Sequence, residues 1–311
     1  MTRSKFLSLM ISGAAVGCAG PEPTPEAEPE SKPRKLVLIA GKPSHPAGMH
    51  EFRAGSLILE KRLREVSGLI VERYDQGWVD DEATLDDADA LVIYSDGGRK
   101  HPAVEGDRLA LIDSLVQRGM GFGCMHYGVE VLADDAGAEF QRWMGGYYEH
   151  EFSCNPIWTP SYESFPDHAV SRGVKPFAAE DEWYFNMRFQ GGFNADGPSE
   201  SGGMKFTPIL VAKPSDETRD GPYVFPDGPY DHIQAAKGRN ETTLWTVERT
   251  DGGRGFGFTG GHFHKNWQND DYRKVVLNAI CWTAGLDIPQ EGVASQAVDD
   301  AEISQNMDPK G

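Results

Sequence analysis

Histidines gather in this sequence just after short apolar segments that have the length of buried strands. The stretch "GRGFGFTGGHFHKNW" (253–267) brings His262 and His264 directly after a glycine-rich apolar run. Five of the nine histidines share this placement: His45, His101, His126, His262 and His264. Neutral imidazoles suit a borderline divalent metal such as zinc, which a carboxylate and an open water position complete in catalytic sites. Such an ion polarises a carbonyl or activates water, so the pattern predicts metal chemistry, with Glu182 or Glu149 as the carboxylate.

A nucleophilic site is the rival interpretation of one of these segments. "GFGCMHYG" places Cys124 near the end of a predicted strand with His126 close behind, a layout similar to the strand–turn–helix elbow that exposes a nucleophile. A helix N-terminus at this point would favour the thiolate. The alternative is that Cys124 is a buried strand residue behind the site. The cysteines that follow Cys18 are odd in number and widely spaced, which does not make a disulfide framework.

The elements that must position these residues alternate between strand and helix. Apolar runs and amphipathic spacing predict, in chain order, a strand at 35–40, a helix at 50–66, strands at 69–74 and 89–95, a helix at 105–117 and a strand at 119–125. This alternation predicts an α/β fold with a mainly parallel sheet and helices on both faces, in a single domain with long loops. Ligands of such sheets bind beyond the carboxyl ends of the strands. We therefore expect the histidines to meet at one edge.

Both ends of the chain differ from this pattern. Residues 1–18 have Arg3 and Lys5, then an apolar run, then small residues that end at Cys18, as in a secretory signal of the bacterial lipoprotein type. We expect export to the periplasm or cell envelope, with Cys18 lipidated and serving as the anchor. The Pro- and Glu-rich residues 19–34 predict a disordered tether. The folded domain is expected over 35–289, followed by a loose acidic tail at 290–311.

The acidic composition narrows the class of partner. The chain has 48 acidic and 30 basic residues, for a formal net charge of −18. Binding to nucleic acid or to anionic lipid without specific contacts depends on positive charge. We therefore expect no nucleic-acid partner, and contact with a membrane only through a lipid anchor.

Several longer motifs resemble one known family. These are "KLVLIAGKPSH", "CMHYGVE", "GGYYEHEFSCNPIW", "DEWYFNMRF" and "RGFGFTGGHFHKNWQNDDYRKVVLNAICWTAG". Together they are similar to a ThuA-like (trehalose-utilisation) domain across 35–289. The resemblance implies a flavodoxin-like sheet related to that of class I glutamine amidotransferases. It does not imply amidotransferase activity, because that class needs a downstream His-x-Glu pair where this chain has His262–Phe263–His264.

The same resemblance implies a carbohydrate substrate. It points to isomerisation or related proton transfer on a keto sugar or oxidised glucoside, with a divalent metal, zinc or manganese. On this interpretation the metal ligands are His126, His262 and Glu182. The catalytic candidates are His101, His45 and Tyr127, with either histidine as the base, and the substrate contacts are Trp183, Tyr184, His264 and Trp267. The alternatives are a non-catalytic carbohydrate-binding domain on the same fold and a cysteine hydrolase that uses Cys124.

Overall fold

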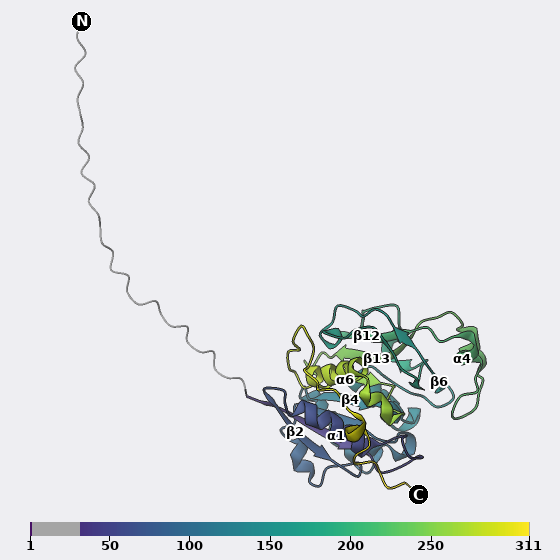
Figure 1. Ribbon diagram of the computed structural model, residues 1–311, viewed down its shortest axis with the longest axis horizontal. Coiled ribbons are helices and arrows are strands. Elements are labelled where there is room, and N and C mark those ends of the chain that lie inside the picture. Colours follow the sequence, from purple (N-terminus) through teal and green to yellow (C-terminus); the bar gives the residue numbers. More distant parts are fainter. Residues whose placement is uncertain (2–31, 311) are drawn as a thin grey trace. The chain divides into compact units, whose positions relative to one another are not determined.

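An eight-stranded sheet forms the centre of the computed structural model, which describes residue 1 and residues 32–310. Five neighbouring strands pair in parallel: β2 (Leu69–Tyr74), β1 (Arg34–Ala40), β3 (Ala90–Tyr94), β4 (Gly121–Met125) and β14 (Arg254–Phe258). Three antiparallel strands extend the sheet beyond β14: β13 (Glu241–Glu248), β12 (Met204–Ala212) and β11 (Ser199–Ser201). Figure 1 shows β2 at one side of the molecule and β12 and β13 at the other. Cys18 and the predicted signal lie outside the described residues.

Helices cover both faces of this sheet. Side chains alternate along each strand, so that Leu36 and Leu38 pack under α1 (Phe52–Leu63) and α6 (Asp270–Thr283). Val37 and Ile39 face the opposite way, toward α2 (Arg108–Gln117) and α3 (Ala138–Met144). Burial on both faces explains why the strands appear in the sequence as continuous apolar runs. The predicted α/β, flavodoxin-like fold is confirmed.

The segment between β4 and β12 is built from short pieces. It contains three two-stranded pairs and is followed, between β12 and β13, by two one-turn helices. The strand pairs are β5 (Gly146–Tyr147) with β10 (Arg188–Phe189), β6 (Ile157–Trp158) with β9 (Asp181–Glu182), and β7 (Ser161–Tyr162) with β8 (Phe177–Ala178). The helices are α4 (Asp216–Asp220) and α5 (Asp231–Ala235). No helix in the described part of the chain combines the length and apolar character needed to cross a bilayer.

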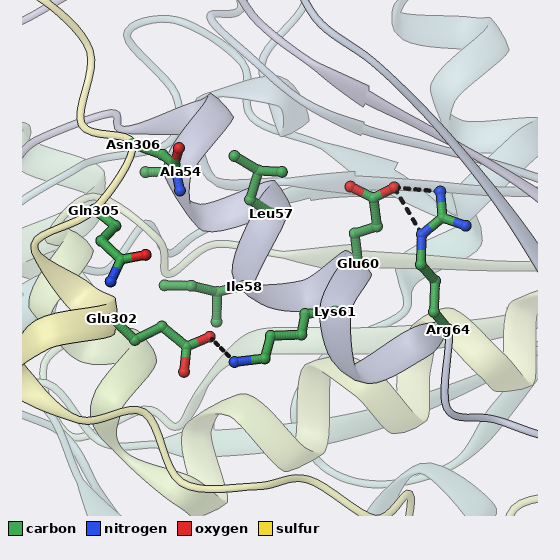
Figure 2. Close-up of a pocket in the computed structure, with 9 residues that line it drawn as sticks. All are labelled: Ala54, Leu57, Ile58, Glu60, Lys61, Arg64, Glu302, Gln305 and Asn306. Carbon is green, nitrogen blue, oxygen red and sulfur yellow. Dashed lines mark hydrogen bonds and ion pairs between the residues drawn. The ribbon is translucent and has the colours of Figure 1, made fainter.

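The residues after Pro289 are not the loose tail that their acidic composition predicts. Val293 and Val298 are buried in the core, and α7 (Asp300–Ile303) packs beside α1 (Figure 1). The buried Arg62 of α1 holds this acidic segment against the domain, because its guanidinium donates to Glu302 and to backbone carbonyls of the segment. Figure 2 shows the shallow hollow between this segment and α1, bordered by the Lys61–Glu302 ion pair.

Candidate metal centre

Four parallel strands end at the same level of the sheet, and predicted site residues lie in the loops that follow these strand ends. The register aligns Ala40 with Tyr94, Tyr94 with Met125, and Met125 with Phe258. The loops that leave β1, β3, β4 and β14 therefore start from a common edge of the sheet. His126 is the first residue after β4, and the loop after β14 carries His262.

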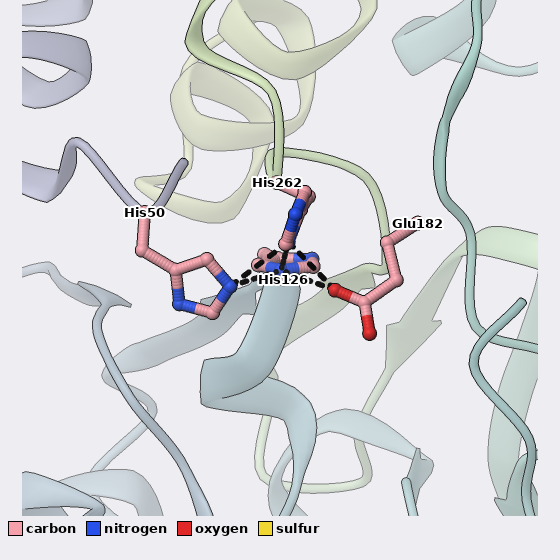
Figure 3. Close-up of side chains that lie close together, drawn as sticks. All are labelled: His50, His126, Glu182 and His262. Atoms are coloured by element: carbon pink, nitrogen blue, oxygen red, sulfur yellow. Dashed lines mark hydrogen bonds and ion pairs between the residues drawn. The ribbon is translucent and has the colours of Figure 1, made fainter. Parts of the chain in front are cut away.

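Three histidines and one glutamate converge at this edge: His50, His126, His262 and Glu182 (Figure 3). His50 Nε2 lies 3.0 Å from both His126 Nε2 and His262 Nδ1. The last two nitrogens are 3.3 Å apart. Glu182 Oε2 lies 2.6 Å from His262 Nδ1 and 3.5 Å from His126 Nε2. All four side chains are buried.

The outer hydrogen bonds of two rings assign their protonation. His126 Nδ1 lies 3.0 Å from the Thr259 carbonyl oxygen and must donate to it. His50 Nδ1 lies 3.2 Å from the Asp96 carboxylate and donates likewise. Each neutral ring then turns an Nε2 lone pair toward the other ring, at 3.0 Å. A proton on one of these nitrogens can form a hydrogen bond to only one neighbouring side chain, whereas a metal cation between the four side chains can bind all of them. Histidine ligands held by a carboxylate or carbonyl in this way are the usual arrangement around metals.

The spacing of the four ligand atoms fits a small tetrahedral ion. Metal–nitrogen bonds of about 2.0–2.1 Å in tetrahedral zinc sites place the ligand atoms roughly 3.3 Å from one another. Five of the six separations, at 2.6–3.5 Å, bracket that value, and the sixth, between His50 and Glu182, is within 4.8 Å. Burial lowers the pKa of His50, which keeps the ring neutral. Burial alone would raise the pKa of Glu182, but His126 and His262 beside it lower that pKa to about 2. These shifts favour the deprotonated forms of His50 and Glu182 that metals bind, and the group of four could hold a metal ion.

The loop that carries His262 is fixed by the residue next to Glu182 in β9. The buried Asp181 carboxylate accepts hydrogen bonds from the backbone N–H groups of Gly261, His262 and Phe263, at 2.9–3.1 Å. Gly261 has a φ of +114°, and a Cβ there would lie 3.3 Å from the His126 side chain. The glycines of the motif thus let the loop turn tightly against the cluster. Because Asp181 and Glu182 are adjacent, one short strand supplies both a member of the cluster and the anchor for another member, His262.

A pocket of about 700 Å³, lined mainly by polar and charged residues, opens beside the cluster. Its lining includes His50, His262 and Glu182 from the cluster and, around them, His45, Tyr127, Glu130, Tyr184 and Phe225. The Tyr184 hydroxyl lies 3.3 Å from His126 Nε2. Burial, followed by the negative charge of Glu182, raises the pKa of Glu130 to about 8. A small molecule in this pocket can therefore reach the cluster and a carboxyl group that keeps its proton at neutral pH.

Comparison with known proteins assigns the family. The family model for ThuA, described as trehalose utilisation, matches residues 44–283. This chain belongs to the ThuA family. That description connects the protein to sugar metabolism, as the motifs predict.

Solved structures of ThuA-like proteins share the fold. The ThuA-like protein of Bacteroides uniformis has 14% identity and a TM-score of 0.55, over 85% of this chain and 96% of its own. The corresponding values for the ThuA-like protein of Parabacteroides merdae are 16% and 0.54, over 88% and 100%. At these identities the likeness is one of fold. Among curated proteins none matches this chain.

The ThuA domain brings together six of the predicted site residues. His126, His262 and Glu182 lie in the cluster, as described above. His45, Tyr127 and Tyr184 line the pocket. The His45 ring stacks on His50 with centroids 3.6 Å apart, and burial lowers its pKa. Tyr184 is nearly fully buried, so it presents its hydroxyl to the site and not a ring face for stacking.

Four predicted residues lie elsewhere in the ThuA domain, outside the lining of the pocket and in contacts within the fold. His101 is buried beside Phe140, where Nε2 donates to the Gly128 carbonyl and Nδ1 accepts from the Ala103 N–H. Both ring nitrogens are thus used within the fold, and burial lowers the pKa of His101 to about 4. The other three residues are Trp183, packed on Phe258 and Tyr272; Trp267, packed on Tyr94 and Tyr272; and His264, whose Nε2 donates to the Ile303 carbonyl.

Two further candidates are excluded by their contacts. Glu149 forms an ion pair with Arg188 through both carboxylate oxygens and is not a ligand of the cluster. Cys124 is buried on the sheet face that packs against α2 and α3, and burial raises its pKa well above the usual value. Its neighbour is the structural His101, at 3.8 Å from Sγ, and not His126. A cysteine hydrolase site is therefore not assembled.

Sequence reasoning missed one member of the cluster and three supporting residues. His50 was expected at the start of a helix, but α1 begins at Phe52 and His50 has a φ of +49°, which places it in the loop after β1. Its position two residues before the helix, in the same loop as His45, was the available signal. Asp96, which orients His50, and Asn155, which donates to Glu182, lie in motifs that carried no obvious ligand pattern. Glu130 follows "CMHYGV" and gave no signal of its own.

Proposed function

We propose that this protein is a metal-dependent enzyme of sugar metabolism that transfers a proton on a keto sugar or an oxidised glucoside, as in isomerisation. The observation that carries the proposal is the buried group of three imidazoles and one carboxylate at the edge of a polar pocket. Membership of a trehalose-utilisation family supports a carbohydrate as the substrate. Zinc and manganese are the ions that we propose first.

In this proposal His50, His126, Glu182 and His262 hold the ion. When bound, it supplies a positive charge that polarises the carbonyl oxygen of the sugar. Asp96 keeps His50 turned toward the centre by accepting from its Nδ1, and Asn155 leaves Glu182 Oε2 free by occupying Oε1. Because these outer contacts are made within the protein, the four side chains are held in position before any ligand arrives.

The pocket also contains two groups suited to moving a proton. The pKa of Glu130 lies near 8, so its carboxyl group is protonated at neutral pH and can donate to a sugar oxygen. The pKa of His45 is lowered by burial, so its ring is neutral and can accept a proton. Two groups whose environments separate their pKa values in this way form a natural acid and base pair. In the proposed reaction they take the part that the sequence assigned to His101 and His45, with Tyr127 as a further hydrogen-bond donor.

Metal analysis tests the first half of this proposal. Purified protein is stripped with a chelator, reconstituted with zinc or manganese, desalted and analysed by mass spectrometry. We expect close to one ion per chain in the wild type, and loss of that ion in His126→Ala and His50→Ala. The exposed His232 provides a matched control, since His232→Ala should retain the ion. A reconstituted wild type without metal refutes the proposed centre.

Hydrogen exchange tests the second half. Keto sugars and oxidised glucosides are incubated with the metal-loaded protein in D₂O, and deuterium entering next to the carbonyl is followed by NMR. We expect exchange that is lost in Glu182→Gln. Binding of a sugar without exchange or conversion would favour the non-catalytic carbohydrate-binding domain.

We also propose that the protein is exported and anchored through Cys18. The proposal rests on the basic, apolar and small-residue layout of residues 1–18. Metabolic labelling of cells with a palmitate analogue should mark the wild type, and Cys18→Ser should abolish the label. An unlabelled wild type would refute the anchor and leave the proposed metal chemistry untouched.

A further inference from the structure

An exposed aromatic side chain stands at the mouth of the pocket that contains the metal cluster. Phe225 is 69% exposed, and its neighbour Val224 is 45% exposed. Both line the pocket, together with the ligands Glu182 and His262. Single exposed apolar residues need no explanation. Two in succession at the rim of a pocket lined mainly by polar and charged residues form a small apolar surface that an entering molecule can contact.

The backbone beneath Phe225 is held in place. The N–H groups of Val224 and Phe225 donate to the backbone oxygen and the side-chain oxygen of Asn155, at 3.2 and 3.3 Å. The preceding Tyr223 is buried, and its N–H donates to the Asp227 carbonyl at 2.8 Å. The exposed ring therefore stands on a fixed loop, so a ligand that packs on it pays little to order the backbone.

The same asparagine ties this loop to the metal cluster. Asn155 Nδ2 donates to Glu182 Oε1 at 2.8 Å, while Asn155 Oδ1 accepts from the Phe225 N–H. One amide group thus joins a ligand carboxylate to the backbone that carries the aromatic ring. The position of the loop that carries Phe225 is therefore fixed relative to the cluster.

The lining of the pocket indicates the chemistry of the occupant. Val224 and Phe225 give the pocket an apolar part, and His150 packs against the Phe225 ring with centroids 5.9 Å apart. Elsewhere the pocket offers charged and hydroxyl groups, among them Arg99, Lys100 and Ser44. A pyranose combines these properties, since its C–H face packs on an aromatic ring while its hydroxyl groups bond to polar side chains. The volume of about 700 Å³ lies within the range of pockets for ligands larger than one small ring.

We propose that Phe225 is the platform of a second sugar subsite, on which the sugar ring farther from the cluster stacks. One ring occupies the cluster end of the pocket, and the other stacks on Phe225 at the rim. This inference rests on the proposed function for the identity of the first ring. The stacking itself requires neither turnover nor a particular reaction.

Binding of two sugars to the metal-loaded full chain tests the subsite. Trehalose serves as the two-ring probe and glucose as the one-ring probe, with affinities measured by calorimetry or ligand-observed NMR. We expect trehalose to bind more tightly than glucose, and Phe225→Ala to weaken trehalose binding about tenfold, from the loss of ring stacking. Phe225→Trp should restore the affinity, and glucose binding should change less than twofold in either variant.

Ile70 of β2 offers a matched control, because it is 50% exposed and does not line the pocket. Ile70→Ala should leave trehalose binding unchanged. The inference is overturned if the wild type does not bind trehalose, or if Phe225→Ala affects trehalose and glucose equally or not at all. If trehalose binding depends on Phe225 but no deuterium exchange occurs on any keto sugar, the subsite stands and the proposed reaction fails.

Discussion

Replacing Asp181 with asparagine should both destabilise the protein and loosen the metal centre. Besides the three loop N–H groups, the carboxylate accepts from the Glu182 N–H at 3.0 Å and from the Tyr272 hydroxyl at 2.6 Å. An asparagine offers one oxygen in place of two and turns an NH₂ group toward donors that have no other acceptor. At least one buried N–H then loses its acceptor, and the remaining bonds lose their charge. We expect a cost of about 3 kcal/mol.

Thermal unfolding of the chelator-treated protein measures this cost. A loss of about 3 kcal/mol corresponds to a fall in Tm of roughly 6–10 °C for a domain of this size. Asp107→Asn is the matched control, because Asp107 is exposed at the start of α2 and its side chain makes no cap hydrogen bond. Metal affinity of the folded Asp181→Asn variant, measured against a competing chelator, should also fall, since His262 loses its anchor. A Tm within 2 °C of wild type, with unchanged metal affinity, would refute the idea that Asp181 fixes this loop.

Three further predictions concern groups around the site. The raised pKa of Glu130 contributes stability that is present below pH 4.5 and is lost as the pH rises through about 8. Across that window the metal-free wild type should therefore lose up to about 4 kcal/mol of unfolding free energy relative to Glu130→Gln, as measured by denaturant unfolding. Parallel pH profiles of the two proteins would contradict this. Lys310→Met should cost about 3 kcal/mol and weaken metal binding, because it leaves the buried Glu51 carboxylate, next to His50, without the ammonium group at 3.2 Å; unchanged unfolding and chelator competition would refute it. Cys124→Ala should retain metal content and sugar exchange, and a folded but inactive variant would return the cysteine mechanism to consideration.

The sequence was informative where a residue follows a strand directly. His126 comes immediately after β4, and the parallel register fixes where that strand ends. Continuous apolar runs predicted strands covered on both faces, and α1, α2, α3 and α6 provide that cover. His101 failed the same rule because it lies seven positions beyond Tyr94, after a turn that redirects the chain into the core. The course of the loop separates these outcomes, since His50 lies ten positions beyond Ala40 and still joins the cluster.

Side-chain direction accounts for the remaining errors. Glu182 and Trp183 are adjacent in extended chain, so their side chains point to opposite sides, and if the first faces the site the second faces the core. This inference was available from the sequence. The separation of His262 from His264 was not, because β14 ends at Phe258 and the alternation of a strand no longer applies after Gly261. Left-handed backbone at His50 and His126 likewise leaves no mark in composition.

The ion pair between Lys310 and Glu51 bears on when, during synthesis of the chain, the cluster can form. The ligands come from positions 50, 126, 182 and 262, and the loop of the first is secured by Lys310, which donates to the His50 carbonyl. The ribosome adds Lys310 after all four of these residues, so a nascent chain carries all four before it can close the loop that holds His50. Metal loading of the proposed centre should therefore follow synthesis of this segment. A change to the chain near Lys310 acts directly beside the proposed metal centre.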